Sequence, residues 1–223
     1  VSITISLILI GCQTQKEETF VSSKVEANYQ DLVSLFKDWR AFEEPPLLDG
    51  APDYTAATFN KRWPQFQKLQ NQLLTMDTAG WKLEEKVDWM IVWAEMNGYD
   101  FNHRIHKPWA RDPAFYYSIW EARSDVPAHE GPTHHGITEV WKYDFPVTGE
   151  QKVNLLKDLN VIPPLYEQAK QNLTGNAREL WIAGIRYMNY QTLALDNLID
   201  KPGVNQDEDL RIAIESAKEA TTG

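Results

Sequence analysis

The residues whose side chains could best bind a substrate or take part in chemistry lie in and just before the stretch KPWARDPAFYY, residues 107–117. Arg111 and Asp112 are placed to form an ion pair, and an arginine can also bind a carboxylate through two parallel hydrogen bonds. Tyr116 adds an aromatic surface that ends in a hydroxyl group. With His103 and Arg104 just before them, these residues form the predicted substrate-binding cluster. The alternative is a buried structural ion pair that fastens the segment to the preceding helix.

Two histidine-containing stretches raise the question of a metal. The sequence HEGPTHH at residues 129–135 resembles the zinc motif His-Glu-x-x-His, but its histidines have the wrong spacing, and Gly131 and Pro132 disfavour a helix. His103 and His106 are three residues apart and could share a metal on a helix. A solvated loop and a helix-end histidine pair are the favoured interpretations. We therefore predict no metal site and assign no catalytic residue in this chain.

The helix that positions the cluster has the longest helical pattern in the chain and begins near Trp81. In its C-terminal half, Glu95, Tyr99 and Asn102 fall on one stripe together with His106. Proline 108 is expected to end the helix. A helix that is apolar nearly all round is predicted to be buried among other helices. Apolar residues lie on one side at Leu83, Val87, Met90, Ile91, Ala94, Gly98 and Phe101, and on the other at Trp89, Val92, Trp93 and Met96.

Further helices follow from apolar periodicity along the rest of the chain. Thr55, Asn176 and Asp207 are candidate N-caps, and Thr148–Gln151 has the pattern of a capping box. Pro64 should kink the second helix or delay its start. The fold class is therefore all-α, a multi-helix array, with helices over residues 27–43, 55–76, 148–159, 163–173 and 177–199, and a last helix from 207.

The segment over residues 107–147 is the least regular part of the sequence, because it is rich in proline and has little periodicity. It is predicted to be one long irregular loop with a short helix over 115–123, capped by Asp112 and with Pro113 in the first helical position. Long loops within a compact domain are often functional.

Composition excludes one class of partner. The net charge is −10 and no basic run occurs, so no nucleic acid is expected as a partner. Nine tryptophans and nine tyrosines suit thick helix–helix layers and also ligand pockets.

The N-terminus resembles that of an exported bacterial lipoprotein. Residues 1–10 form an apolar run typical of a signal peptide, and Leu9-Ile10-Gly11-Cys12 resembles a lipobox. Cys12, the single cysteine, is therefore the predicted lipidation site and the anchor to the membrane. Residues 1–12 are interpreted as a signal peptide truncated at its start, 13–26 as a polar spacer, and 27–223 as a helical N-terminal lobe of a larger domain. The expected location is the cell envelope, on the periplasmic side of the outer membrane in a Gram-negative cell.

Three stretches resemble the N-terminal part of the bacterial family named domain of unknown function 885. They are VDWMIVWAEMNGYDFNHRIHKPWARDPAFY, SDVPAHEGP and IPPLYEQAKQNLTGNARELW, and the similarity spans most of residues 29–203. The resemblance implies an exported, largely helical protein similar to zinc metallopeptidases. It also implies that zinc and the catalytic base belong to a C-terminal half that lies outside this sequence.

The expected function follows from that resemblance. The chain would form the substrate-cleft lobe of a zinc-dependent peptidase, holding a peptide-like substrate while a metal-activated water attacks it. The alternative is a non-enzymatic, membrane-anchored lipoprotein that binds a small ligand or a peptide.

Overall fold

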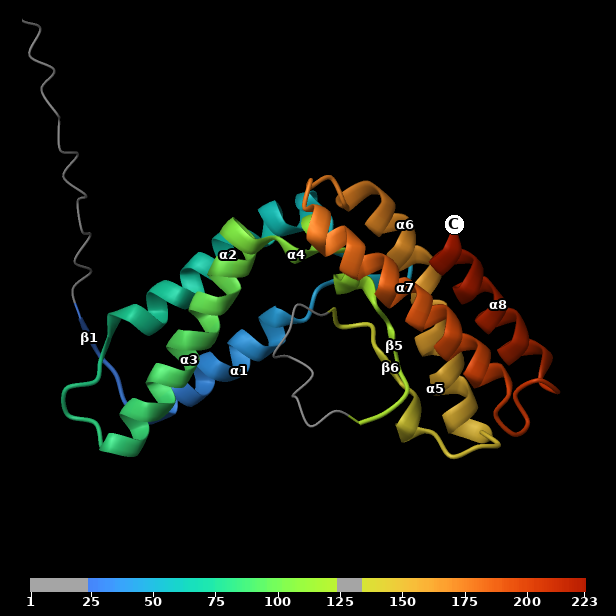
Figure 1. The fold of residues 1–223 in the computed structure, drawn as a ribbon. Helices are drawn as coiled ribbons and strands as arrows, with labels where there is room; N and C mark the ends of the chain where they lie inside the picture. The colour runs from blue at the N-terminus through green and yellow to red at the C-terminus, as the bar shows by residue number, and fades with distance from the viewer. Residues whose placement is uncertain (1–23, 124–133) are drawn as a thin grey trace, which may run out of the picture.

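The computed structural model describes residues 24–123 and 134–223 and is mostly helical, which confirms the predicted fold class. Figure 1 shows an arch in which one group of helices, α1 to α3, meets a second group, α5 to α8. The predicted signal peptide with Cys12 and the His-Glu stretch over residues 129–133 lie outside the described residues.

The first helical group contains α1 (Tyr29–Glu43), α2 (Ala56–Thr75) and α3 (Leu83–Phe101), which pack against one another. The side chains of Asn28 and Thr55 cap α1 and α2, and they fix where these helices begin. The buried core of this group consists of Leu32, Leu35, Trp39, Phe42, Phe66, Leu69, Leu73, Met76, Val92 and Met96.

A short irregular path leads from α3 into the second group. The helix continues into η1 (Asn102–His106), one π-helical turn, where the N–H of Lys107 donates to the carbonyl of Asn102 at 2.7 Å. Lys107 has a positive φ of 48°, which is uncommon outside glycine. It directs the chain into α4 (Pro108–Arg111) and then η2 (Pro113–Tyr116), a 3-10 helix that the Asp112 side chain caps.

The second helical group contains α5 (Gly149–Asn160), α6 (Ile162–Asn172), α7 (Arg178–Ile199) and α8 (Glu208–Thr222). Helix α8 packs against the other three, and η2 packs on α7. Asp207 caps α8, as predicted. The centre of this larger core consists of Leu155, Leu159, Ile162, Leu165, Leu195, Leu198, Leu210 and Ile214.

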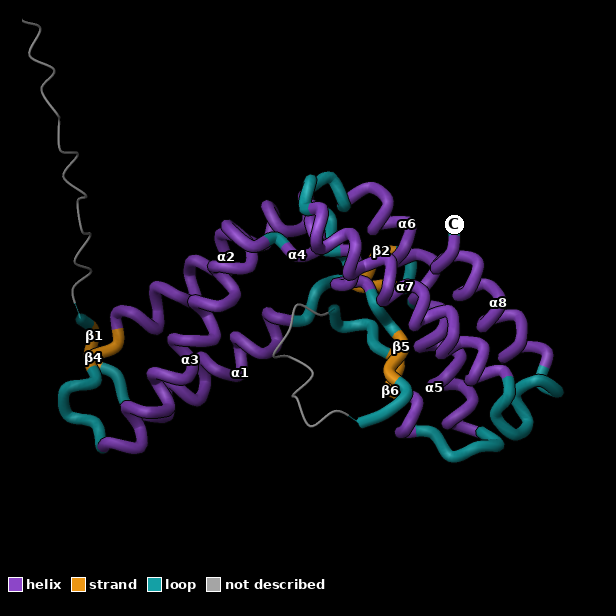
Figure 2. Tube along the Cα trace, in the orientation of Figure 1, coloured by secondary structure: helices purple, strands orange, loops and turns teal. Residues whose placement is uncertain are grey.

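Short strands tie distant loops together, as the orange segments of Figure 2 show. Strands β1 (Val25–Glu26) and β4 (Met76–Asp77) pair in parallel, with Val25 opposite Met76. Strands β2 (Leu47–Leu48) and β3 (Ala51–Pro52) form an antiparallel pair, with Leu48 opposite Ala51. Strands β5 (Ile119–Trp120) and β6 (Thr138–Glu139) are parallel, with Ile119 opposite Thr138, and η3 (Val140–Lys142) follows β6.

Several local predictions were wrong. The helix expected over 115–123 is instead η2 followed by β5, because the 3-10 turn ends at Tyr116 and the chain then extends. The described parts of 107–147 contain only the short elements α4, η2, β5, β6 and η3, joined by irregular segments. Helix α2 begins at Ala56 and runs through Pro64, so its start is not delayed, and the kink at Pro64 stays a prediction. Neither Thr148 nor Asn176 provides a side-chain cap to its helix.

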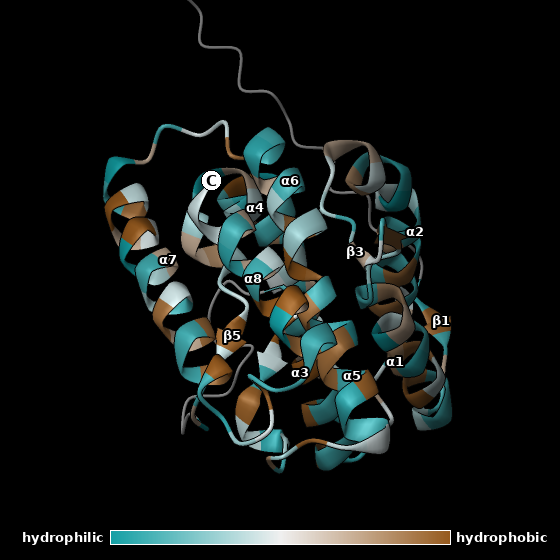
Figure 3. Ribbon diagram, turned by 90° about the vertical axis from the view of Figure 1, so that its right-hand side faces the viewer, coloured by the Kyte–Doolittle hydropathy of each residue, from teal (hydrophilic) through white to brown (hydrophobic). Residues whose placement is uncertain are grey.

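The burial predicted for α3 was also wrong. The face with Val92 and Met96 packs in the core, whereas the stripe from Leu83 to Phe101 lies open, with Met90 59% exposed. Helix α7 has an open apolar side as well, where Ile185 is 61% exposed. Figure 3 shows this side as hydrophobic bands along α7 at the edge of the molecule. Helical periodicity detects an apolar face but does not tell whether another element covers it.

Candidate functional site

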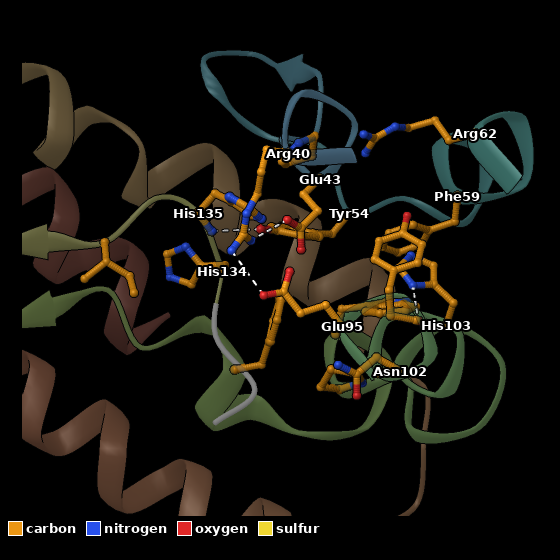
Figure 4. Close-up of a pocket in the computed structure, with 17 residues that line it drawn as sticks. Arg40, Glu43, Tyr54, Phe59, Arg62, Glu95, Asn102, His103, His134 and His135 are labelled. Atoms are coloured by element: carbon orange, nitrogen blue, oxygen red, sulfur yellow. Dashed lines mark hydrogen bonds and ion pairs between the residues drawn. The ribbon is translucent and has the colours of Figure 1, made fainter. Parts of the chain in front are cut away.

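A cavity with a volume of about 570 Å³ lies where the two helical groups meet. Its walls come from the ends of α1, α2 and α3, and from the segments that follow α3 and precede β6. Figure 4 shows charged, histidine and aromatic side chains from these elements around one space. A cavity of this size is typical of small-molecule and peptide-fragment sites. We treat this junction cavity as the candidate functional site.

Arg62 provides a positive charge on the α2 wall. Phe59, Arg62, Trp63 and Phe66 share one face of α2, since they follow an i, i+3, i+4, i+7 spacing. The guanidinium lies over the Phe42 ring, 4.5 Å from its centroid. Its Nη2 donates to the backbone carbonyls of Phe42 and of Glu44, the latter at 2.9 Å. These contacts fix the guanidinium without neutralising it, and no carboxylate of the described residues forms an ion pair with it.

A second charged group lies between α1 and α3, next to the end of α1 that Arg62 contacts. In Figure 4, Arg40 lies between Glu43 and Glu95. Its guanidinium is 2.6 Å from the Glu43 carboxylate and 3.3 Å from that of Glu95. Trp39 Nε1 also donates to Glu95, at 3.4 Å. Two carboxylates, those of Glu43 and Glu95, thus flank the Arg40 guanidinium at the cavity.

His103 stands between the two cores of the molecule. Its ring stacks on Tyr99 with centroids 3.8 Å apart, and the rings of Phe59, Trp63 and Trp109 surround it at 4.6–6.1 Å. Nδ1 lies 3.0 Å from the Tyr99 carbonyl, which can only accept, so Nδ1 carries the proton. Burial lowers the pKa of His103 to about 4, so the ring is neutral at pH 7. Its Nε2 is then a buried acceptor without a hydrogen-bond partner.

Ser118 and His134 form a buried pair that superficially resembles a nucleophile and its base. His134 Nε2 is 3.1 Å from Ser118 Oγ, and Nδ1 accepts the Gly136 N–H at 2.9 Å. Since Nδ1 accepts, a neutral His134 carries its proton on Nε2 and donates to the serine, whose hydroxyl donates to the Tyr116 carbonyl at 2.8 Å. His134 therefore cannot take a proton from Ser118 in this arrangement, and the pair is structural. Burial also lowers the pKa of His134, to about 3.

Tyr54 and His135 connect the cavity wall to α6. The Tyr54 hydroxyl accepts the His135 backbone N–H at 2.8 Å, and the Tyr54 N–H donates to Gln168 Oε1 at 3.0 Å. Burial raises the pKa of Tyr54 and lowers that of His135. Both side chains are therefore neutral at pH 7 and offer hydrogen bonds rather than charge.

The structure separates the five predicted substrate-binding residues. His103 lines the cavity, but Arg104 points to solvent and pairs with Asp100. Arg111 is exposed, and its Cγ lies against Gly175. These residues do not form one cluster.

The remaining two predicted residues are buried in structural roles. Asp112 caps η2 by accepting the Ala114 N–H at 2.9 Å, and it makes no ion pair with Arg111, so that part of the prediction was wrong. The Tyr116 hydroxyl donates to the Trp109 carbonyl at 2.7 Å and accepts from Asn172 at 3.2 Å. Of the polar stripe on α3, Glu95, Tyr99 and Asn102 line the cavity, while His106 bonds to Asn102 instead.

The described residues do not suit the zinc that the resemblance implies. Within residues 24–123 and 134–223, no three His, Cys, Asp or Glu side chains converge as metal ligands do. His103 and His106 point to different partners and share no site. The zinc expectation concerns residues outside this sequence and stays a prediction.

No protein-family model, curated protein or solved structure matches this chain. The resemblance to domain of unknown function 885 therefore stays a prediction. Among the described helices, none combines the length and the apolar composition that a membrane span requires.

Proposed function

We propose that this chain forms the ligand-binding wall of an exported, peptidase-like protein, and that a peptide-like substrate binds in the junction cavity. Zinc and the catalytic base would come from residues outside this sequence, while these residues hold the substrate. The proposal includes a lipid anchor on Cys12 and a location in the cell envelope.

The observation that carries the proposal is the polarity of the cavity. Arg62 offers a guanidinium that no carboxylate of the described residues pairs with, and Arg40 lines the same cavity together with the carboxylates of Glu43 and Glu95. Aromatic rings, including Phe59, Trp109 and Phe115, line this cavity as well. A peptide matches this pattern, since it carries opposite charges at its ends and apolar side chains between them.

A second candidate function is non-enzymatic binding of a ligand or peptide by a membrane-anchored lipoprotein. The arrangement of the buried histidines favours it. His134 is held as a hydrogen-bond donor to Ser118, and His103 is enclosed by four aromatic rings. These histidines fix local structure or recognise a ligand, and neither is paired with a nucleophile it could activate.

Filling the cavity tests both functions. A side chain added at Gly98, which lines the cavity on α3, has no heavy atom within 4 Å of its Cβ, so Gly98→Leu should fold and occupy the space. Gly80 has equally open surroundings and lies outside the cavity lining, so Gly80→Leu is the matched control. The full chain is dialysed against a mixture of short peptides, and retained peptides are identified by mass spectrometry. Wild type and Gly80→Leu should retain peptides, and Gly98→Leu should not.

The outcomes separate the candidates. No retention by wild type would contradict both. The two candidates are separated with the protein as it is made in the cell, including any residues outside this sequence. Peptides that this protein shortens, with shortening abolished by a chelator, support the peptidase. Peptides that it retains and returns intact support the binding protein.

A further inference from the structure

Two groups that line the junction cavity have hydrogen-bonding atoms without a partner among the described residues, namely the guanidinium of Arg62 and Nε2 of His103. We propose that they form a carboxylate-recognition site, in which Arg62 binds the C-terminal carboxylate of a peptide and His103 Nε2 accepts the N–H of the same terminal residue. This inference rests on the proposed function, because it names the part of a peptide that the cavity would recognise.

Two donor groups of Arg62 remain available. Both of its hydrogen bonds leave from Nη2, so its Nη1 and Nε donors have no partner among the described residues. Both two-pronged edges of a guanidinium use an Nη2 hydrogen, so a carboxylate would bind here through a single charge-assisted hydrogen bond from Nη1 or from Nε. The bonds from Nη2 to two backbone carbonyls and the Phe42 ring beneath hold the guanidinium in place. A fixed guanidinium loses little side-chain entropy when an anion binds.

The electrostatic environment indicates that the Arg62 charge acts on the cavity. Besides burial, its positive charge contributes to lowering the pKa of His103 and His135. The nearby acid Asp53 is occupied, since it accepts from the Thr55 N–H at 2.9 Å and from the Thr58 hydroxyl at 2.5 Å. No carboxylate of the described residues makes an ion pair with Arg62, and in the proposed site a ligand supplies the complementary anion.

His103 supplies an acceptor that has no donor among the described residues. Its Nδ1 proton is committed to the Tyr99 carbonyl, which leaves the Nε2 lone pair without a donor. A buried acceptor without a partner destabilises the protein by the lost hydration of that atom. A ligand N–H would restore this hydrogen bond, while an ether or a hydrocarbon in the same place would not.

The spacing along α2 explains why both groups would contact one terminal residue. Phe59 and Trp63 flank Arg62 on the same helix face, and both rings contact His103, at 4.6 Å and 6.1 Å between centroids. The two polar groups thus share an aromatic surround that suits an apolar terminal side chain. A free carboxylate, an adjacent N–H and an apolar body together define the C-terminal residue of a peptide.

Three related probes test the proposal on the wild-type full chain. N-acetyl-phenylalanine has the carboxylate and the N–H, N-acetyl-phenylalaninamide of the same size lacks the free carboxylate, and the smaller 3-phenylpropionate lacks the acetamido group with its N–H. Binding is measured by calorimetry and by tryptophan emission, since Trp63 and Trp109 surround His103. Because charge-assisted hydrogen bonds are the strong ones, N-acetyl-phenylalanine should bind about tenfold or more tightly than either of the others.

Two variants assign the preference to named groups. Arg62→Gln keeps donors for the Phe42 and Glu44 carbonyls but removes the charge, so it should abolish the preference for the free carboxylate. His103→Phe keeps an aromatic ring in the cage and removes the acceptor, so it should abolish the preference for the N–H. Arg211→Gln, on the exposed side of α8 where Arg211 pairs with Glu215, is the control and should change neither. Thermal unfolding checks that each variant folds.

The proposal is overturned if wild type binds the acid and its amide equally well, a comparison that needs no variant. It is also overturned if folded Arg62→Gln retains the preference for the acid. In either case, peptide retention by wild type would still support the proposed function. If wild type retains no peptide at all, the proposed function itself fails.

Discussion

At the scale of single residues, the buried histidines show how position decides the role of a titratable group. His134 is 2% exposed and has a fixed tautomer, because one ring nitrogen accepts from Gly136 and the other donates to Ser118. His103 has the opposite tautomer, with Nδ1 protonated and Nε2 bare. The first histidine is fully used by the fold, whereas the second keeps an atom that a ligand can engage.

The lowered pKa of His134 predicts how the free energy of unfolding depends on pH. The folded-state pKa of about 3 lies below the ordinary value of 6.5, so the unfolded chain binds the proton more readily. The stability linked to a neutral His134 is complete above pH 6.5 and is lost as pH falls toward 3. His134→Phe leaves the Gly136 N–H without its acceptor and should cost about 1–3 kcal/mol at pH 7.5. Urea unfolding at a series of pH values measures the difference from wild type.

That difference should shrink as pH falls from about 6.5, since only wild type has His134 to protonate on unfolding. A stability difference that is the same at pH 7.5 and pH 4.5 would show that His134 is not held neutral in the folded protein.

The signal for Arg62 was present in the sequence but was not used. An arginine within the apolar spacing of Phe59, Trp63 and Phe66 is placed among aromatic rings of one helix face, which is unusual for a charge. Sequence reasoning instead favoured Arg111 and Asp112, because adjacent opposite charges suggest a pair. It did correctly place Glu95, Tyr99 and Asn102 on one stripe of α3, since helical geometry alone determines that. Groups that different elements bring together, such as Arg62 and His103, need the tertiary structure.

At the scale of elements, α3 has two apolar faces with different environments. Met96 is fully buried against α1 and α2, while Met90, on the same helix, is mostly exposed. Periodicity predicted the helix and the position of both stripes but could not show which stripe was covered. The π-helical turn at its end was likewise not predictable, because residues 102–106 read as an ordinary continuation of the helix.

The two methionines form a matched pair for mutation. Met90→Gln should change the free energy of unfolding by less than about 0.5 kcal/mol, because the side chain already contacts water. Met96→Gln should cost about 2–4 kcal/mol, because it places an amide in an apolar core. Chemical denaturation of both variants measures the two values. Equal costs would mean that the open stripe of α3 is covered when the protein is in solution.

At the scale of the whole molecule, the fold has two apolar cores rather than one. The α1–α3 core and the larger core of α5 to α8 meet around His103, which contacts rings associated with each. The sequence predicted the all-α class and nearly every long helix, since those depend on local patterns. It did not predict two cores, because that division depends on contacts between residues far apart in the chain.

Because the molecule has two apolar cores, we expect that one helical group can unfold locally while the other stays folded. Phe66→Ala, in the smaller core, should increase amide hydrogen exchange in α1, α2 and α3 more than in α5, α6 and α8. Leu165→Ala, in the larger core, should have the reverse effect. Hydrogen exchange followed by mass spectrometry measures both patterns. Uniform acceleration across all helices in either variant would show that the molecule opens as one cooperative unit.

Because of the π-helical turn before Lys107, the number of residues in this turn determines the direction in which the chain enters the junction. A π turn holds one residue more than an α-helical turn, and each residue of a helix advances the direction of the chain by roughly 100°. Loss of a single amino acid between Asn102 and His106 would preserve every apolar pattern on either side, yet it would swing the following segment around the helix axis and carry Trp109 away from His103. We therefore expect the number of residues in this turn to be preserved more strictly than the identity of any side chain in it.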